Sequence, residues 1–265
     1  LADMGFDEAI TYSFIDTRHD GVFENVPALL DEKVEDKYIT LQDSVIDGAL
    51  RMRPSILPGL LDAVRLNLNF QRRDLKLFEI GKVFAAHAGE DNLPNEREIL
   101  TIAVTGGEIS EGKAVTVREL DLYDAKGALE AAFDAVGIQN AGFITADVKH
   151  LRKGQTAAVS VDGAKVGYIG RLSDEIAAAY KFKQPVYVAE IDLQAILDIA
   201  TVPIAYRPLS KYPAITRDVS LLGDRNISFS AISDAVTEQN FELCRNVNFV
   251  DVYEGKGLQE NERSI

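Results

Sequence analysis

Four arginines lie close together in the sequence and have the chemistry needed to bind phosphate. Arg51 and Arg53 precede an apolar helical pattern, and Arg72 and Arg73 follow it. A guanidinium group is planar and permanently charged, so it can pair with phosphate through two parallel hydrogen bonds. The alternative is a solvated helix edge together with one buried ion pair. The sequence favours this alternative and keeps the phosphate patch as a second interpretation.

Other side chains that could do chemistry are isolated. His19, His87 and His150 are far apart, and none has the spacing of paired metal ligands, so we expect surface histidines and no metal site. The single cysteine, Cys244, lies in an apolar, strand-like stretch and is predicted to be a small buried hydrophobic residue. No nucleophile elbow or Walker loop is present in the sequence.

Composition limits the classes of protein that fit. The chain has 265 residues, of which 46% are hydrophobic, so it can form one or two globular domains. No apolar run approaches the roughly 20 residues of a membrane helix, and the N-terminus lacks the basic region of a secretion signal. The net charge of −14 argues against broad nucleic-acid coating, so any RNA contact is expected to be local. The absence of an initial methionine suggests a fragment.

The arginines flank a helix and a strand that must position them. Apolar residues from Leu57 to Leu68 recur at spacings of three and four, which predicts an amphipathic helix with Ser55 as its N-cap and Pro58 in its first turn. A central strand is predicted from Leu75 to Phe84. Within it, Gly81 would let another group approach the backbone.

Further elements follow from pattern and turn chemistry. The sequence predicts strands at 10–15, 38–41, 100–104 and 187–193, a helix at 121–136 ended by Gly137, a hairpin of 156–161 with 165–172 around Asp162-Gly163, and a short helix from Ser173 to about Tyr180.

Several of these segments resemble one family. Residues 52–61 and 77–84, with their Arg-x-Ser, Leu-Pro-Gly-Leu-Leu and Phe-Glu-Ile-Gly sequences, are similar to the β subunits of bacterial phenylalanyl-tRNA synthetases. Residues 121–127 and 167–172 continue the resemblance, although Ser173-Asp174 stands where the family has His-Pro. The resemblance implies an α+β fold for residues 1–204: a mixed, mainly antiparallel sheet flanked by helices, as in class II synthetase cores.

The same resemblance implies that this core is inactive. A class II catalytic strand normally continues into an arginine that contacts ATP, but Phe84 is followed by Ala85-Ala86-His87. Residues 167–171 resemble the glycine-rich third motif only superficially and are better explained as a hairpin strand. We therefore expect no catalytic residue and no bound cofactor here, with ATP and Mg²⁺ used by the whole enzyme.

Residues 205–265 differ in character. Three prolines in 207–218 break regular structure, and the sequence then predicts a strand at 219–222, a helix capped by Ser228 and a strand at 247–253. This β-α-β order and the motifs at its two ends resemble the ferredoxin-fold anticodon-binding domain of the family. The resemblance implies that this second domain is incomplete.

One tyrosine carries the RNA hypothesis. In the family, the tyrosine of an Asp-x-Tyr-x-Gly segment stacks on an anticodon base, and Tyr253 holds that position here. Lys211, Arg217 and Lys256 are expected near the phosphates. A core tyrosine of the strand is an equally good interpretation of Tyr253 from sequence alone.

The resemblance as a whole implies a role without catalysis by this chain. It implies a cytoplasmic α₂β₂ enzyme in which the α subunit attaches phenylalanine to its tRNA, while this chain supports the α core and helps to recognise the anticodon; neither a membrane nor DNA is an expected partner. One alternative is a free-standing synthetase-like paralogue that regulates another enzyme or binds RNA. Another is an independent enzyme with an unrecognised pocket.

Overall fold

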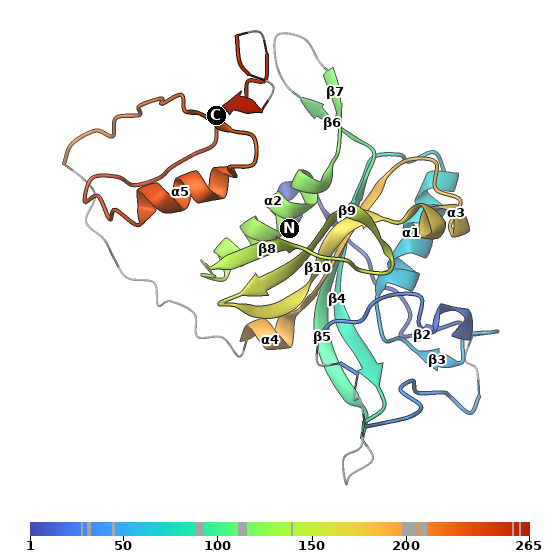
Figure 1. Ribbon diagram of the computed structural model, residues 1–265. Helices are drawn as coiled ribbons and strands as arrows, with labels where there is room; N and C mark the ends of the chain where they lie inside the picture. The colour runs from blue at the N-terminus through green and yellow to red at the C-terminus, as the bar shows by residue number, and fades with distance from the viewer. Residues whose placement is uncertain are drawn as a thin grey trace. The chain divides into compact units, whose positions relative to one another are not determined.

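The chain divides into two compact units, residues 1–205 and residues 206–265, which are described separately. Figure 1 shows the computed structural model. The structure describes all residues except 28, 31–32, 44–45, 88–92, 111–115, 139, 198–205, 207–210, 256 and 260, and it leaves out the side chains of 109, 110 and 116.

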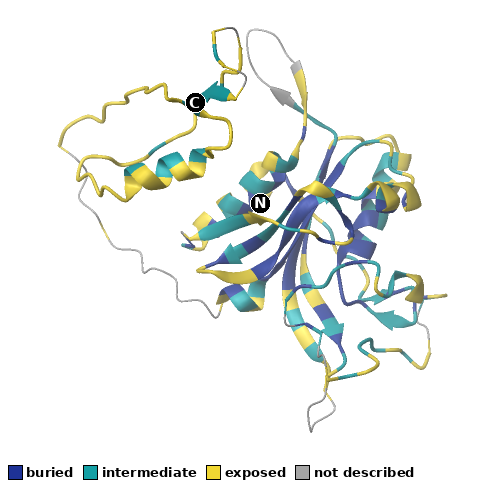
Figure 2. Cartoon of the chain, viewed as in Figure 1, coloured by how far each residue is buried: buried dark blue, intermediate teal, exposed yellow. Residues whose placement is uncertain are grey.

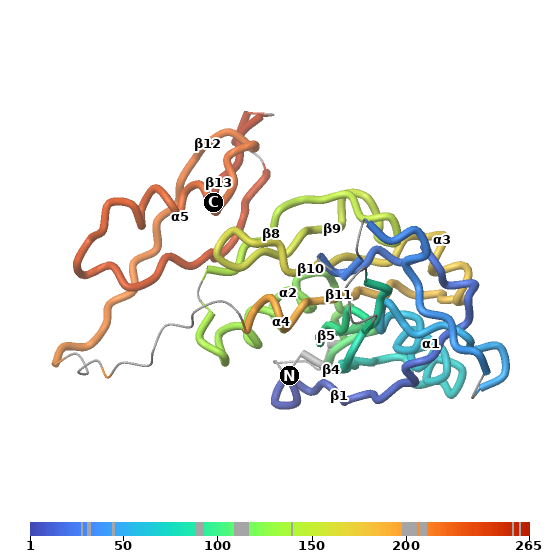
Figure 3. Tube along the Cα trace, turned by 90° about the horizontal axis from the view of Figure 1, so that it is seen from below, coloured from blue at the N-terminus to red at the C-terminus, as the bar shows by residue number. Residues whose placement is uncertain are grey.

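A seven-stranded sheet forms the centre of the first unit. Its strand order is β1-β4-β5-β11-β10-β9-β8, and every neighbouring pair is antiparallel except β1 with β4. The strands are β1 (Asp7–Glu8), β4 (Leu75–Ala85), β5 (Asn95–Thr105), β8 (Ala141–Thr145), β9 (Leu151–Val161), β10 (Ala164–Leu172) and β11 (Val186–Asp192). Figure 3 shows β1 beside β4 at the sheet edge.

Helices cover both faces of this sheet. α1 (Leu57–Asn69) and α3 (Asp174–Ala179) lie on one face, and α2 (Leu122–Ala135) and α4 (Leu193–Leu197) lie on the other (Figure 1). Each face has its own hydrophobic core, and the buried residues follow the centre of the sheet (Figure 2). The remaining elements are the 3₁₀ turns η1 (Ala2–Met4) and η2 (Thr17–His19), and the pairs β2 (Phe14–Ile15) with β3 (Arg51–Met52) and β6 (Gly107–Ser110) with β7 (Thr116–Glu119).

Local sequence signals explain most of these elements. The side chain of Asp121 caps α2 in a capping box, and Gly137 beyond its end has a φ of 80°, as the sequence predicted. The predicted hairpin of β9 and β10 is also confirmed, with both turn residues, Asp162 and Gly163, at positive φ. Ser173 caps α3 as expected.

Two predicted strands are shorter than the sequence suggested. The predicted strand at 10–15 is regular only at Phe14–Ile15, and the predicted strand at 38–41 contributes a single bridge from Thr40 to Arg51. In the first case, side-chain contacts hold the segment in place of a regular ladder. The Thr11 hydroxyl donates a hydrogen bond to Glu79 and accepts one from Arg53. Periodicity alone does not reveal such contacts.

His150 is buried, so the prediction of a surface histidine is wrong at this position. Its Nδ1 accepts a hydrogen bond from the Glu24 backbone N–H at 3.0 Å, and the ring meets Phe23 edge-on. Burial, and secondarily the charge of Lys149, lowers the pKa of His150 to about 3. His19 is partly buried and stacks on Tyr180, and burial lowers its pKa also.

The buried imidazole predicts a pH effect. Below pH 6.5 an unfolded chain protonates this histidine while the folded chain does not, so acid lowers the stability contributed by His150. In His150→Asn, the amide oxygen can accept the hydrogen bond from the Glu24 N–H, and the amide does not titrate. We expect the stability of the wild type relative to this variant to fall by about 2 kcal/mol between pH 7 and pH 5, measured by urea unfolding. A stability difference between the wild type and His150→Asn that does not change with pH would contradict the assignment.

The second unit contains β12 (Leu222–Asp224), α5 (Phe229–Thr237) and β13 (Glu262–Ser264), with Ser228 capping α5 as predicted. The predicted strand at 247–253 is not regular in the described residues, since only Tyr253 forms a bridge, with Ser264. Among the described residues of this unit none is buried, so the prediction of a buried Cys244 is wrong and its thiol is exposed. A strand without a core to cover it gains little from pairing.

Candidate nucleic-acid interface and buried polar centre

Arg53 is the centre of a buried network. Its Nη1 lies 2.7 Å from Glu79 Oε1 and donates to Thr11 Oγ1 at 3.0 Å, and its Nε donates to the Lys82 carbonyl at 2.9 Å. The two charged side chains are only 5% and 3% exposed. A Cβ at Gly81 would lie 2.5 Å from the guanidinium, which explains the glycine of the family motif. The prediction that a group approaches the backbone here is confirmed.

Glu190 on β11 forms a second buried polar centre. Its Oε1 accepts hydrogen bonds from Ser55 Oγ at 2.9 Å, Ile56 N at 2.9 Å and Thr101 Oγ1 at 3.3 Å. Burial raises the pKa of this carboxyl to about 7, although the hydrogen bonds act in the opposite direction. Ile56, not Ser55, is the N-cap residue of α1, while Ser55 Oγ accepts from Leu57 N and donates to Glu190.

The two centres give the Arg-x-Ser motif a structural role. Arg53 ties the segment before α1 to β4, and Ser55 ties the start of α1 to β11. Glu190 is a site residue that the sequence analysis did not single out. The carboxylates of an otherwise apolar strand, Glu190 and Asp192, were the signal that could have identified it, because such groups must find partners when buried.

The four arginines do not form one phosphate site. Arg51 forms a close ion pair with Asp20 at 2.5 Å, Arg53 is buried, and Arg72 and Arg73 are exposed after α1. The favoured interpretation, one buried ion pair with an exposed helix edge, is therefore confirmed.

The residues over the sheet do not fit an ATP site. Ala85 is buried where an active synthetase strand would continue towards an arginine, and Arg97 is paired with the buried Asp192 at 2.5 Å. Residues 167–171 lie in β10 as a hairpin strand. In the described part of the chain, no group of three or more His, Cys, Asp or Glu residues is placed to hold a metal ion. Phosphate binding would require charges that are already neutralised here.

The second unit positions the predicted RNA-binding tyrosine. Tyr253 exchanges two backbone hydrogen bonds with Ser264, of 2.8 and 3.0 Å, and Leu222 pairs with the same residue from the other side. Its ring lies against Gly255, where a Cβ would come within 2.4 Å of the ring, and the residue remains 54% exposed.

The structure describes two of the three other predicted RNA-binding residues. Lys211 and Arg217 are exposed in the segment that leads to β12, while Lys256 lies outside the described residues. None of these positions by itself establishes an RNA contact, and their assignment remains a prediction.

The sheet and its helices define a class of protein. Two solved structures of pyrrolysyl-tRNA synthetase from Desulfitobacterium hafniense superpose with TM-scores of 0.51, at 16% and 15% identity, covering 74% of this chain and 63% of each of those chains. The first unit thus has the fold of an aminoacyl-tRNA synthetase core, and the predicted α+β fold class is confirmed.

Sequence comparison then gives the family. The model of the phenylalanyl tRNA synthetase beta chain CLM domain matches residues 1–193, and that of the ferredoxin-fold anticodon binding domain matches residues 210–265. The chain belongs to the family of phenylalanine–tRNA ligase β subunits. Its whole length matches such subunits of Carboxydothermus hydrogenoformans at 33% identity, Listeria innocua at 31% and Bacillus subtilis at 30%, and spans about a third, 32%, of each.

In the part of the chain that the structure describes, no helix has the length and apolar character required to cross a membrane.

Proposed function

We propose that this chain acts as a non-catalytic part of a cytoplasmic phenylalanine–tRNA ligase, supporting the catalytic α subunits of an α₂β₂ enzyme and helping to recognise the tRNA anticodon. The enzyme would use ATP and Mg²⁺ to attach phenylalanine to its tRNA, with those ligands held outside this chain. The inward orientation of Arg53 is the main support for the proposal. This arginine of the Arg-x-Ser motif is already bonded to Glu79 and Thr11 and is not available to a ligand.

An apolar edge of the first unit supports an α-subunit partner. Ile10 and Tyr12 are 90% and 72% exposed on either side of the anchored Thr11. Ile80, on the strand β4 that pairs with β1, is also exposed. Exposed apolar groups gathered at a sheet edge are typical of a surface that a partner covers.

The intact protein that contains this chain is used to test whether catalysis belongs to the α subunit. Phenylalanylation of tRNA should require the α subunit, and the α subunit should co-purify with the protein. Phenylalanyl-adenylate formation by this chain alone would contradict the proposed non-catalytic role. A protein that neither co-purifies with an α subunit nor supports aminoacylation would contradict the proposed assembly.

The anticodon contact gives a separate prediction. Tyr253→Ala removes a half-exposed ring. The backbone of residue 253 stays hydrogen-bonded to Ser264, so the fold around it should change little. Loss of one base-stacking contact should weaken tRNA binding by about 1–3 kcal/mol, roughly 5- to 150-fold. Tyr253→Phe keeps the aromatic face and should retain most of the affinity. Equal binding by Tyr253→Ala and wild type in a filter-binding titration would reject the stacking role.

A further inference from the structure

Many positively charged side chains in the first unit pair with a carboxylate, but four at one end of the sheet pair with none in the described part of the chain. Arg72 and Arg73 follow α1, and Lys181 and Lys183 lie between α3 and β11. All four are exposed, and none forms an ion pair with any residue that the structure describes. We call these four residues the basic cluster.

The fold brings the two halves of the basic cluster together. Gln184 Nε2 donates to the Arg73 carbonyl at 2.7 Å and to Thr105 Oγ1 at 2.9 Å. Thr105 in turn pairs with Leu75 on one side and Val186 on the other, so the end of α1 and the segment before β11 meet at one end of the sheet. Like charges gathered in this way on a chain of net charge −14 indicate an anionic ligand.

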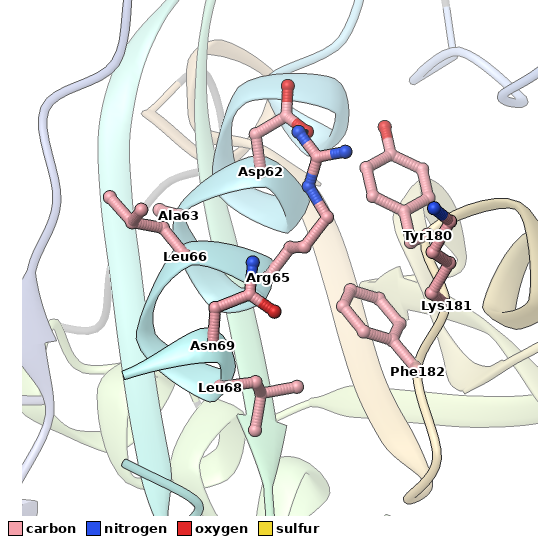
Figure 4. Close-up of a pocket in the computed structure, with 9 residues that line it drawn as sticks. All are labelled: Asp62, Ala63, Arg65, Leu66, Leu68, Asn69, Tyr180, Lys181 and Phe182. Carbon is pink, nitrogen blue, oxygen red and sulfur yellow. Dashed lines mark ion pairs between the residues drawn. The ribbon is translucent and has the colours of Figure 1, made fainter. Parts of the chain in front are cut away.

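A groove of about 570 Å³ adjoins the basic cluster. In Figure 4, Tyr180, Lys181 and Phe182 face Arg65 and Asn69 of α1 across it. This volume is within the range of small-ligand sites and is large enough for a nucleotide. Arg65 is paired with Asp62 at 2.8 Å, so Lys181 supplies the unpaired charge at the groove.

Tyr180 adds a second observation that indicates a ligand. Its hydroxyl is buried and has no hydrogen-bond partner among the residues that the structure describes, although such groups are nearly always paired. Burial, the largest effect on it, raises the pKa of Tyr180, so the group remains a hydrogen-bond donor. Phe70 directly follows Asn69, which lines the groove, and is 73% exposed.

We propose that the basic cluster and the groove form a second RNA contact on the first unit. The RNA backbone lies along Arg72, Arg73, Lys181 and Lys183, and a nucleotide entering the groove displaces the side chains that cover the Tyr180 hydroxyl and accepts its hydrogen bond. Phe70 provides an aromatic face for an unpaired base. An acidic protein surface would balance the charges but would leave the aromatic face and the nucleotide-sized groove unexplained. The proposal rests on the proposed function, because tRNA is the RNA concerned.

The test measures tRNA binding by the intact protein assembled with its α subunit. Arg72→Gln/Arg73→Gln and Lys181→Gln/Lys183→Gln each remove two charges. Each should weaken binding about tenfold and reduce the slope of log K against log salt by about 1.5, since one phosphate contact contributes roughly 0.7–0.9. The matched control Lys149→Gln/Lys153→Gln removes two charges elsewhere in the first unit and should change affinity less than about twofold.

Tyr180→Phe separates a binding role from a structural one. Removing a buried hydroxyl that lacks a partner should leave the melting temperature unchanged or raise it, while tRNA affinity falls several-fold. Lower thermal stability with unchanged tRNA affinity would overturn the proposed role of Tyr180.

The outcomes distinguish this site from the anticodon contact. If Tyr253→Ala weakens binding while both charge-removing pairs leave affinity and salt slope unchanged, the second contact is rejected and the proposed function stands. If the wild-type assembly does not bind tRNA, both are rejected. If the charge-removing pairs release the α subunit instead of weakening its tRNA binding, the cluster is a protein interface and the proposal fails.

Discussion

Replacing Arg53 by methionine is expected to lower the free energy of unfolding by about 3–5 kcal/mol. The change leaves Glu79 as a buried charge without its partner, and it also removes donors from the Lys82 carbonyl and from Thr11. Urea unfolding of the wild type and the variant measures the difference. The effect is large because both groups are almost completely shielded from water.

A double-mutant cycle shows whether the loss comes from an unpaired charge. Arg53→Met/Glu79→Met removes both charges, so the double variant should be more stable than Arg53→Met alone. The exposed pair of Lys82 and Glu96 provides a control, because Lys82→Met should change stability far less than Arg53→Met does. A similar small loss for Arg53→Met would show that the buried pair does not hold the segment in place.

Removing the side chain of Glu190 is expected to cost at least about 3 kcal/mol. In Glu190→Ala, the Ser55 hydroxyl, the Ile56 N–H and the Thr101 hydroxyl lose a shared acceptor in a site closed to water. Each buried group left unpaired costs about 1–3 kcal/mol. Glu190→Gln keeps a carbonyl acceptor and should be far less destabilised at neutral pH. Equal losses in the two variants would show that packing, not hydrogen bonding, determines the effect.

The same pair of variants tests the titration of Glu190. Above pH 4.5 the unfolded carboxyl ionises, while the folded one stays protonated until about pH 7. The folded state therefore binds more protons in this window, and this contribution to stability decreases as the pH rises through it. Relative to the wild type, Glu190→Gln should gain about 3 kcal/mol between pH 4 and pH 8. A constant difference across this range would refute the raised pKa.

The titrations of Glu190 and His150 have opposite effects on folding stability between pH 4.5 and 6.5. Raising the pH weakens the contribution of the buried acid and strengthens that of the buried imidazole. The wild type is therefore expected to show a shallow pH profile over this window. The single variants should have steeper profiles of opposite sign, so each titration is best measured as a difference from the wild type.

Sequence reasoning recovered the elements whose signals are local. The capping box at Asp121, the turn at Asp162-Gly163 and the helical stripe of α1 each depend on residues close together in the chain. The class of fold also followed from motifs, while the sequence indicated one buried ion pair among the four arginines without identifying its members. The need for Gly81 followed from its place within a central strand.

The missed features depend on long-range contacts. Glu190 meets Ser55 across 135 positions, and His150 is covered by a segment 126 positions away, so neither burial is visible in a local pattern. Cys244 shows the converse, since an apolar neighbourhood in sequence produced no buried site. The basic cluster likewise combines two segments, only one of which the sequence had marked.

The strand order also has a consequence for synthesis on the ribosome. β5 lies between β4 and β11, but β11 begins only at Val186. Until that residue emerges, the nascent chain carries an eleven-residue β5 with one edge unsatisfied. Such an edge can pair with other chains, so the nascent chain is expected to be prone to aggregation and to benefit from chaperones during this stretch of translation.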